Sequence, residues 1–299
     1  MSSASSVLGC KTKESHLAVG GSSGTPFETI VSDLDLFLIG SDDETALAIR
    51  REIGRFCGRS VDLEHMEKAR FFKLTDELRR YRPQLSAGLS PFVFGDLRFL
   101  VRACQGSPIF SDNAIGNRLK EIREPLRIAS AFYLSSLFVM RYQDAYGLFS
   151  ANRIEDLTLV SGELVQLACL LALLHGDLVD LAPKSAPRRA VLFGKGGLDI
   201  LAGRTIEHFR FVDRANERDW ALNLLYLANA IVAAGILAGR VAAHHSVGSD
   251  WAAEYCLMGV PGYLSAINVA TNRIALINEA YLQALATDRF RQKVEGCLH

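Results

Sequence analysis

The sequence predicts an α+β protein in which a small domain built on a β-sheet precedes a large all-helical domain. Up to about residue 65, short apolar runs alternate with Gly, Ser and Asp, which is typical of strands joined by turns. After residue 65, apolar residues recur with the period of helices, and turn residues are rare. A strand, a helix and another strand of these lengths indicate a small α/β sheet in the first part.

The expected elements follow from this periodicity and from the residues that cap helices and form turns. In the sheet domain we expect strands over 17–19, 34–39 and 59–64 and a helix over 43–57, capped by Ser41 or Asp42 and ended by Gly58. In the helical part we expect helices over 65–81, 96–103, 113–150, 154–181, 197–212, 217–245 and 250–286, with a break or kink at Pro125. Segment 183–189, which contains two prolines, is expected to be an exposed connector.

The composition is that of a globular protein, with no bias toward nucleic acid or membranes. Among 299 residues, 33 are basic and 33 acidic, so no surplus of cations exists to neutralise a run of phosphates, and we expect no bulk binding of nucleic acid. Six scattered cysteines without a C-x-x-C pair indicate reduced thiols in a cytoplasmic protein. The uncharged segment 221–239 contains Asn223 and Asn229 and is rich in alanine, which predicts a buried helix rather than a membrane span.

Carboxylates mark the start of the second predicted strand. Asp33 and Asp35 stand two residues apart at its head, so both side chains emerge on one face. Two like charges this close repel each other unless a cation lies between them. Oxygen ligands without a neighbouring His or Cys favour a hard ion such as Mg²⁺, which also binds substrate phosphates. Asp62 has the same phase in the next predicted strand, so three carboxylates are expected to converge on a two-metal site.

A glycine-rich turn follows the first predicted strand. Its small residues, Gly20 to Gly24, would let backbone N–H groups and the Ser22 hydroxyl approach a triphosphate closely. The order Gly21-Ser22, then Asp33 and Asp35, then Asp62 after an intervening helix resembles the nucleotidyltransferase fold of the DNA polymerase β superfamily. It looks closest to the minimal nucleotidyltransferases and the antibiotic adenylyltransferases, and it covers residues 16 to 64, about a fifth of the chain.

The resemblance implies both a domain organisation and a reaction. It implies a small mixed-sheet nucleotidyltransferase domain over residues 1–90 and a helical bundle domain over residues 91–299. Gly21 and Ser22 would hold the β and γ phosphates of a nucleoside triphosphate, and Asp33 and Asp35 would coordinate two Mg²⁺ ions. Asp62 would bind the catalytic metal and help to deprotonate an acceptor hydroxyl, which attacks the α-phosphorus in line as pyrophosphate leaves.

The chain departs from the superfamily pattern in two respects: no Arg or Lys follows the Gly-Ser pair closely, and the segment before the first strand is too short for much of the helix that these proteins usually place there. The charge of the triphosphate is then expected to be met elsewhere, by one of four residues: Arg50, Arg51, Arg59 or Lys68.

Three further acids have two interpretations each. Glu64 shares the face of Asp62 and could serve as a general base, or it is a solvated strand end. Glu163 and Asp177 fall in an apolar helical run, where each could face an acceptor pocket or lie on an exposed helix edge.

From the sequence we expect a cytoplasmic, Mg²⁺-dependent enzyme that transfers a nucleoside monophosphate, AMP from ATP, to a hydroxyl of a small-molecule acceptor. Two alternatives stay open: a protein-modifying (AMPylating) enzyme of the antitoxin type, and a catalytically silent scaffold that binds nucleotide. A homodimer is also compatible with the sequence, because Ala- and Gly-rich helices can form either a core or an interface.

Overall fold

The computed structural model describes residues 14–20, 33–81, 90–177, 179–194 and 198–210, with scattered residues between 217 and 232. Within these residues the fold is mixed α+β, with a small four-stranded sheet and a majority of helical residues, as predicted. The chain divides into two compact units, Met1–Arg82 with Phe92–Ala129 and Pro83–Pro91 with Ser130–His299. The unit that contains the sheet therefore continues beyond the predicted boundary at residue 90.

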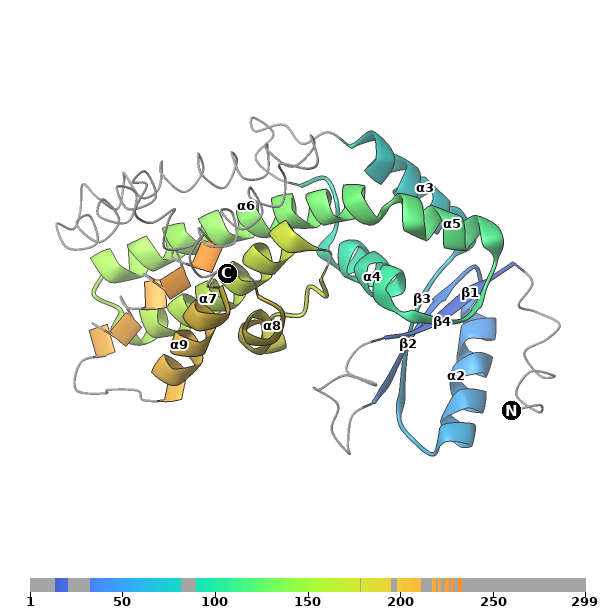
Figure 1. The fold of residues 1–299 in the computed structure, drawn as a ribbon, viewed down its shortest axis with the longest axis horizontal. Coiled ribbons are helices and arrows are strands. Elements are labelled where there is room, and N and C mark those ends of the chain that lie inside the picture. Colours follow the sequence, from blue (N-terminus) through green and yellow to red (C-terminus); the bar gives the residue numbers. More distant parts are fainter. Residues whose placement is uncertain are drawn as a thin grey trace, which may run out of the picture. The chain divides into compact units, whose positions relative to one another are not determined.

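The sheet has the strand order β3-β2-β1-β4 (Figure 1). Its strands are β1 (His16–Gly20), β2 (Leu34–Ile39), β3 (Val61–Met66) and β4 (Ser107–Ser111). β1 pairs antiparallel with β2 and β4, whereas β2 and β3 are parallel. The expected strands at 17–19 and 34–39 are confirmed. The third begins two residues later than expected and reaches Met66, because the chain is still turning at Arg59 and Ser60 after the preceding helix.

Helix α2 (Asp43–Cys57) connects the parallel strands and has the predicted bounds. Its N-cap is Asp42, whose carboxylate accepts a hydrogen bond from the Thr45 N–H at 2.8 Å. Gly58 ends it in the left-handed conformation, with φ of 62°, and donates its N–H to the Gly54 carbonyl. The buried face of α2 packs against one face of the sheet, in a core formed by Leu17, Leu36, Leu38, Ala46, Ile49 and Val61.

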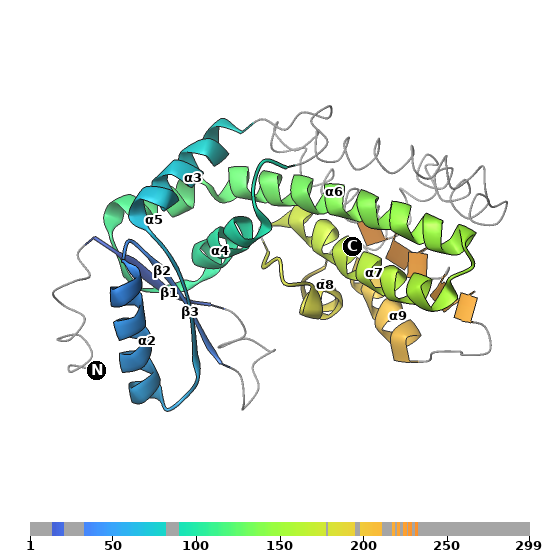
Figure 2. The same ribbon diagram turned by 180° about the vertical axis from the view of Figure 1, so that it is seen from behind.

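The other face of the sheet is covered by α4 (Phe94–Gln105), on the side opposite to α2 (Figure 2). The Phe99 ring of α4 meets Phe37 of β2 edge to face, with ring centroids 6.1 Å apart. Gly106 follows α4, and a Cβ there would lie 2.9 Å from both Ala18 Cβ and the Val19 carbonyl oxygen. Glycine is therefore required where the end of α4 comes down onto β1.

Two features of the first unit differ from the sequence prediction. Strand β4 was not predicted, because it is short and contains Pro108, which weakens the strand pattern. The helix expected over 113–150 is two helices, α5 (Asn113–Glu121) and α6 (Arg123–Ser150), which meet at Ile122. Pro125 accounts for the break, because it has no N–H to donate to the Glu121 carbonyl and is tolerated in the first turn of α6. Helix α3 (Lys68–Arg80) precedes this region.

In the second unit, all regular elements among the described residues are helices. Besides most of α6, these are α7 (Ile154–Gly176), the short 3₁₀ helix η2 (Pro183–Ser185), α8 (Ala186–Phe193) and α9 (Leu198–Arg210). The prediction of an exposed connector at 183–189 is wrong. Its two prolines lie at the starts of η2 and α8, where a missing N–H costs nothing, and the Arg189 side chain is buried and donates to the carbonyls of Asp180 and Ala182.

Helix α7 includes the stretch Ile154–Leu174, which is long and apolar enough to cross a membrane among the helices that the structure describes. Two thirds of its most apolar window is buried inside the protein, as in a core helix. The segment 221–239, which we considered as a span from the sequence, is described only at single residues, and the helix expected over 250–286 lies outside the described part.

Three of the six cysteines fall in the described part of the chain, and all three are free thiols, in agreement with the sequence prediction. Cys57 is exposed, whereas burial raises the pKa of Cys104 and of Cys169 to about 12. These two thiols are therefore held in the protonated, unreactive form.

The helix α2 glycines provide a matched test of the fold. A Cβ at Gly54 would make only ordinary contacts of 3.8 Å, so Gly54→Ala is expected to raise the free energy of unfolding by about 0.5–1 kcal/mol through helix propensity. Gly58→Ala is expected to lower it by about 1–2 kcal/mol, because its φ of 62° strains an alanine. Urea denaturation measures both changes. Changes of the same sign would contradict the described end of α2.

His16 gives the sheet a pH-dependent stability. Its side chain is buried, Nδ1 lies 2.8 Å from Ser111 Oγ, and Nε2 has no hydrogen-bond partner among the described residues. Burial lowers the pKa of His16 below its usual 6.5, so the unfolded chain takes up the proton first as the pH falls. Stability is therefore fully present above pH 6.5 and is lost below it, by at most about 1.4 kcal/mol per pH unit. Denaturation between pH 8 and 5 should show this slope, and His16→Gln should flatten it; equal slopes would contradict the assignment.

Candidate metal and nucleotide site

The predicted carboxylates lie on the face of the sheet opposite to α2. Leu34, Leu36 and Leu38 alternate along β2 with Asp35 and Phe37, and the leucines pack toward α2. Because neighbouring residues of a strand point to opposite faces, Asp35 shares its face with Phe37, which contacts α4.

Strand register brings two of these acids together. The Asp35 Cα is paired with Asp62 of β3 on one side and with Gly20 of β1 on the other. Directly paired residues of neighbouring strands project to the same face, about 5 Å apart. Asp33 precedes Asp35 by two residues and is exposed, Asp35 is half-buried, and Asp62 is exposed. The structure thus places a row of Gly20, Asp35 and Asp62 across three strands, with Asp33 at its border.

Gly21 and Ser22, the predicted phosphate-binding residues, lie outside the described residues. They follow Gly20 directly in the sequence, and Gly20 is the β1 partner of Asp35. Gly20 itself is required by packing, since a Cβ there would lie 2.7 Å from the Phe37 ring.

The donor set suits a hard divalent cation, because Asp33, Asp35 and Asp62 offer only carboxylate oxygens. In the positions described, no three His, Cys, Asp or Glu side chains are gathered closely enough to hold a metal ion. The backbone pairing fixes where the Asp35 and Asp62 side chains start, and the exposed side chains of Asp33 and Asp62 have room to turn toward a cation. A metal here would have to draw these carboxylates together.

The next row of the same face carries a partly buried ion pair. Glu64 of β3 accepts a hydrogen bond from Arg102 Nη1 of α4 at 2.7 Å, and Arg98 Nη2 lies 3.9 Å from the same oxygen. The Arg102 side chain is only 9% exposed and also lies over the Phe37 ring. Glu64, a candidate general base from the sequence, is therefore a partner of Arg102, and α4 covers the row next to the acids. Arg102 gave no signal in the sequence, because its partner is 38 residues away.

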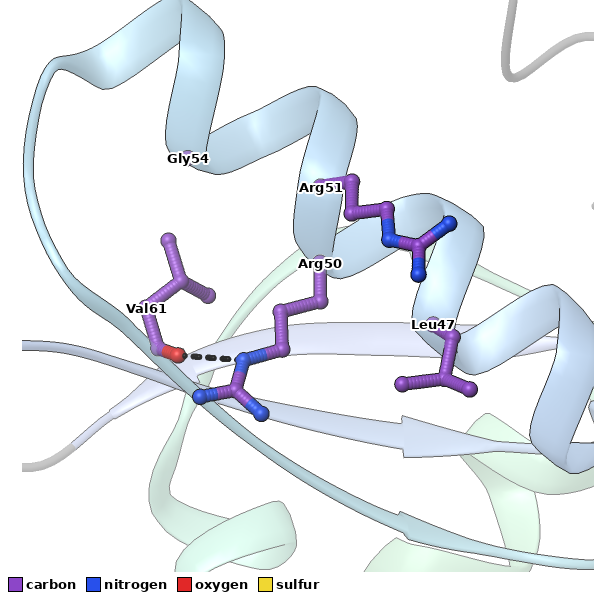
Figure 3. Close-up of a pocket in the computed structure, with 5 residues that line it drawn as sticks. All are labelled: Leu47, Arg50, Arg51, Gly54 and Val61. Carbon is purple, nitrogen blue, oxygen red and sulfur yellow. Dashed lines mark hydrogen bonds between the residues drawn. The ribbon is translucent and has the colours of Figure 1, made fainter.

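Of the four residues considered as phosphate-binding cations, Arg59 is exposed two residues before β3, at the end of the sheet where the acids lie, and the other three lie elsewhere. Lys68 follows the far end of β3, where its Nζ lies 3.3 Å from Asp112 and 3.4 Å from Glu14. Burial alone would lower the pKa of Lys68, but the hydrogen bonds and charges of Asp112 and Glu14 leave it raised. Lys68 is thus a structural cation at the opposite end of the strands. Arg50 and Arg51 line a pocket beside α2 (Figure 3).

In the second unit, Glu163 of α7 forms an ion pair with Arg141 Nε of α6 at 3.1 Å. Its side chain is half exposed and lines an open groove between α6 and α7. Asp177 is exposed just after α7. Both positions agree with the helix-edge interpretation of these acids.

Comparison of the chain with protein-family models, with curated proteins and with solved structures found no match. The chemistry proposed below therefore rests on the residues and their geometry.

The Glu64–Arg102 pair is expected to be a main electrostatic support of this face. Arg102→Met should lower the free energy of unfolding by about 2 kcal/mol, because it leaves the Glu64 carboxylate without its closest partner in a partly buried place. Arg98→Met, on the same helix, should cost less than about 1 kcal/mol, since its contact is long and its side chain is 39% exposed. Urea denaturation of both variants checks this. Equal losses of unfolding free energy would show that the Glu64–Arg102 pair stabilises the fold no more than the longer contact of Arg98.

Proposed function

We propose that the protein is a Mg²⁺-dependent nucleotidyltransferase that transfers AMP from ATP to a hydroxyl of a small-molecule acceptor and releases pyrophosphate. In this proposal the sheet belongs to a nucleotidyltransferase domain of the DNA polymerase β type, and the helical domain supplies the acceptor pocket. The enzyme would act in the cytoplasm.

The observation that supports the proposal is the pairing of Asp35 with Asp62 in parallel register, with Asp33 two residues before Asp35. The alternation along the strands predicted only that Asp62 and Asp35 face the same side of the sheet. The register adds that the two residues are directly paired across β2 and β3. A one-residue slip would turn Asp62 to the α2 face and remove it from the set. The pairing of Asp35 with Asp62 is therefore a property of the sheet, although the two residues lie 27 positions apart in the chain.

Mg²⁺ bound by Asp33, Asp35 and Asp62 would supply charge neutralisation for the triphosphate and the developing transition state. The chain's own residues have separate tasks. Asp33 and Asp35 would hold Mg²⁺ from one strand, and a carboxylate oxygen of Asp62 on the next strand would accept the proton of the acceptor hydroxyl. The new bond joins the hydroxyl oxygen to the α-phosphorus, and the bond that breaks releases pyrophosphate.

Substitution of the acids tests the proposal. Thermal-shift titrations with ATP, GTP, CTP and UTP, each with and without Mg²⁺, are expected to show stabilisation by ATP that requires Mg²⁺. Asp35→Asn and Asp62→Asn should abolish this response and reduce pyrophosphate release in an acceptor screen by about a hundredfold or more. Glu44→Gln, an exposed carboxylate on α2, is the matched control and should change neither.

The outcomes separate the alternatives. Label transferred to a polypeptide instead of a small molecule would indicate the protein-modifying enzyme. Nucleotide binding that needs Mg²⁺ and the acids but releases no pyrophosphate would indicate the silent scaffold. If no nucleotide stabilises the protein with Mg²⁺, or if Asp35→Asn responds like the wild type, the proposed site is wrong.

A further inference from the structure

A separate pocket of about 330 Å³ lies between α2 and the outer strand β3 (Figure 3). It is lined by Leu47, Arg50, Arg51, Gly54 and Val61. Val61 packs into the core beneath α2, whereas the next residue, Asp62, belongs to the opposite face. The pocket is therefore distinct from the row of acids, although both use β3.

The pocket carries two positive charges, and no carboxylate among the described residues neutralises them. Neither Arg50 nor Arg51 has a carboxylate within 4.0 Å among the residues that the structure describes. By contrast, Arg55, one turn farther along α2, lies 3.9 Å from Glu52. Two neighbouring positive charges repel each other, so the ligand that this pocket favours is an anion.

Arg50 is held in place for such a contact. Its Nε donates a hydrogen bond to the Val61 carbonyl at 2.9 Å, which fixes the guanidinium plane against the edge of β3 (Figure 3). Among the described residues, no carboxylate lies within 4.0 Å of the two terminal nitrogens of Arg50, which are the part of the guanidinium group that matches phosphate oxygens. Arg51, the next residue of α2, points away from Val61, toward the side of the pocket where Leu47 lies (Figure 3).

We propose that this pocket binds the phosphate group of a small phosphate monoester, with Arg50 and Arg51 as its ligands. Two guanidinium groups, of which Arg50 is held in place, match a dianionic monoester in charge, and Leu47 offers an apolar wall for the rest of the molecule. A nucleic acid backbone is a poorer match, because it requires a longer run of cations than a chain of zero net charge presents here. Binding in this pocket needs no metal ion, unlike binding at the acids.

Calorimetric titration of the full-length protein in EDTA tests the inference, with ribose 5-phosphate as the probe and ribose as the phosphate-free control. Ribose 5-phosphate is expected to bind the wild type, and ribose is not. Arg51→Gln should weaken binding by about tenfold, because it removes one charge-assisted contact and leaves the Arg50–Val61 hydrogen bond intact. Arg55→Gln, on the same helix outside the pocket, is the matched control and should bind like the wild type.

Three results would overturn the inference: no binding of ribose 5-phosphate to the wild type, equal binding by Arg51→Gln, or tighter binding of a ten-nucleotide RNA without a terminal phosphate. Asp35→Asn separates this inference from the proposed function. It should lose the Mg²⁺-dependent nucleotide response and keep the binding of ribose 5-phosphate in EDTA. Each site can therefore fail while the other stands.

Discussion

The parallel register between β2 and β3 is the constraint on which the candidate site depends. Helix α2 makes this pairing possible, because parallel neighbours need a crossover connection, and its apolar face fixes which side of both strands is buried. Once Leu36, Leu38 and Val61 face α2, Asp35 and Asp62 must share the other face. Packing on the α2 side of the sheet thus determines which side chains project from the other side.

The charged side chains on the sheet face opposite to α2 lie in rows of paired residues across β2 and β3. The row of Asp35 and Asp62 is open to solvent at Asp62, and the next row, with Phe37 and Glu64, is covered by α4. Arg102 is the buried cation of that covered row, where it neutralises Glu64. Glu64 therefore has a close cationic partner on this face, at 2.7 Å.

Much of the first unit could be predicted from the sequence, because its signals are local. The cap at Asp42, the glycine at 58 and the alternation along β2 fix the bounds of their elements within a few residues. The phase of Asp62 was also local, but its pairing with Asp35 required the sheet. Other features depend on partners distant in the chain: strand β4, the Glu64–Arg102 pair and the ion pairs of Lys68. Prolines misled the prediction at 183–189, where they begin helices.

The hydrogen bond from Arg50 to the Val61 carbonyl also bears on the protection of the sheet edge against aggregation. β3 is an outer strand, and an open strand edge can template pairing with another chain and lead to aggregation. The Arg50 side chain occupies one of the acceptors of that edge and adds a charge beside it. At the other outer strand, Pro108 of β4 has no N–H to offer. Both outer strands of the sheet are thus made poor partners for a further strand.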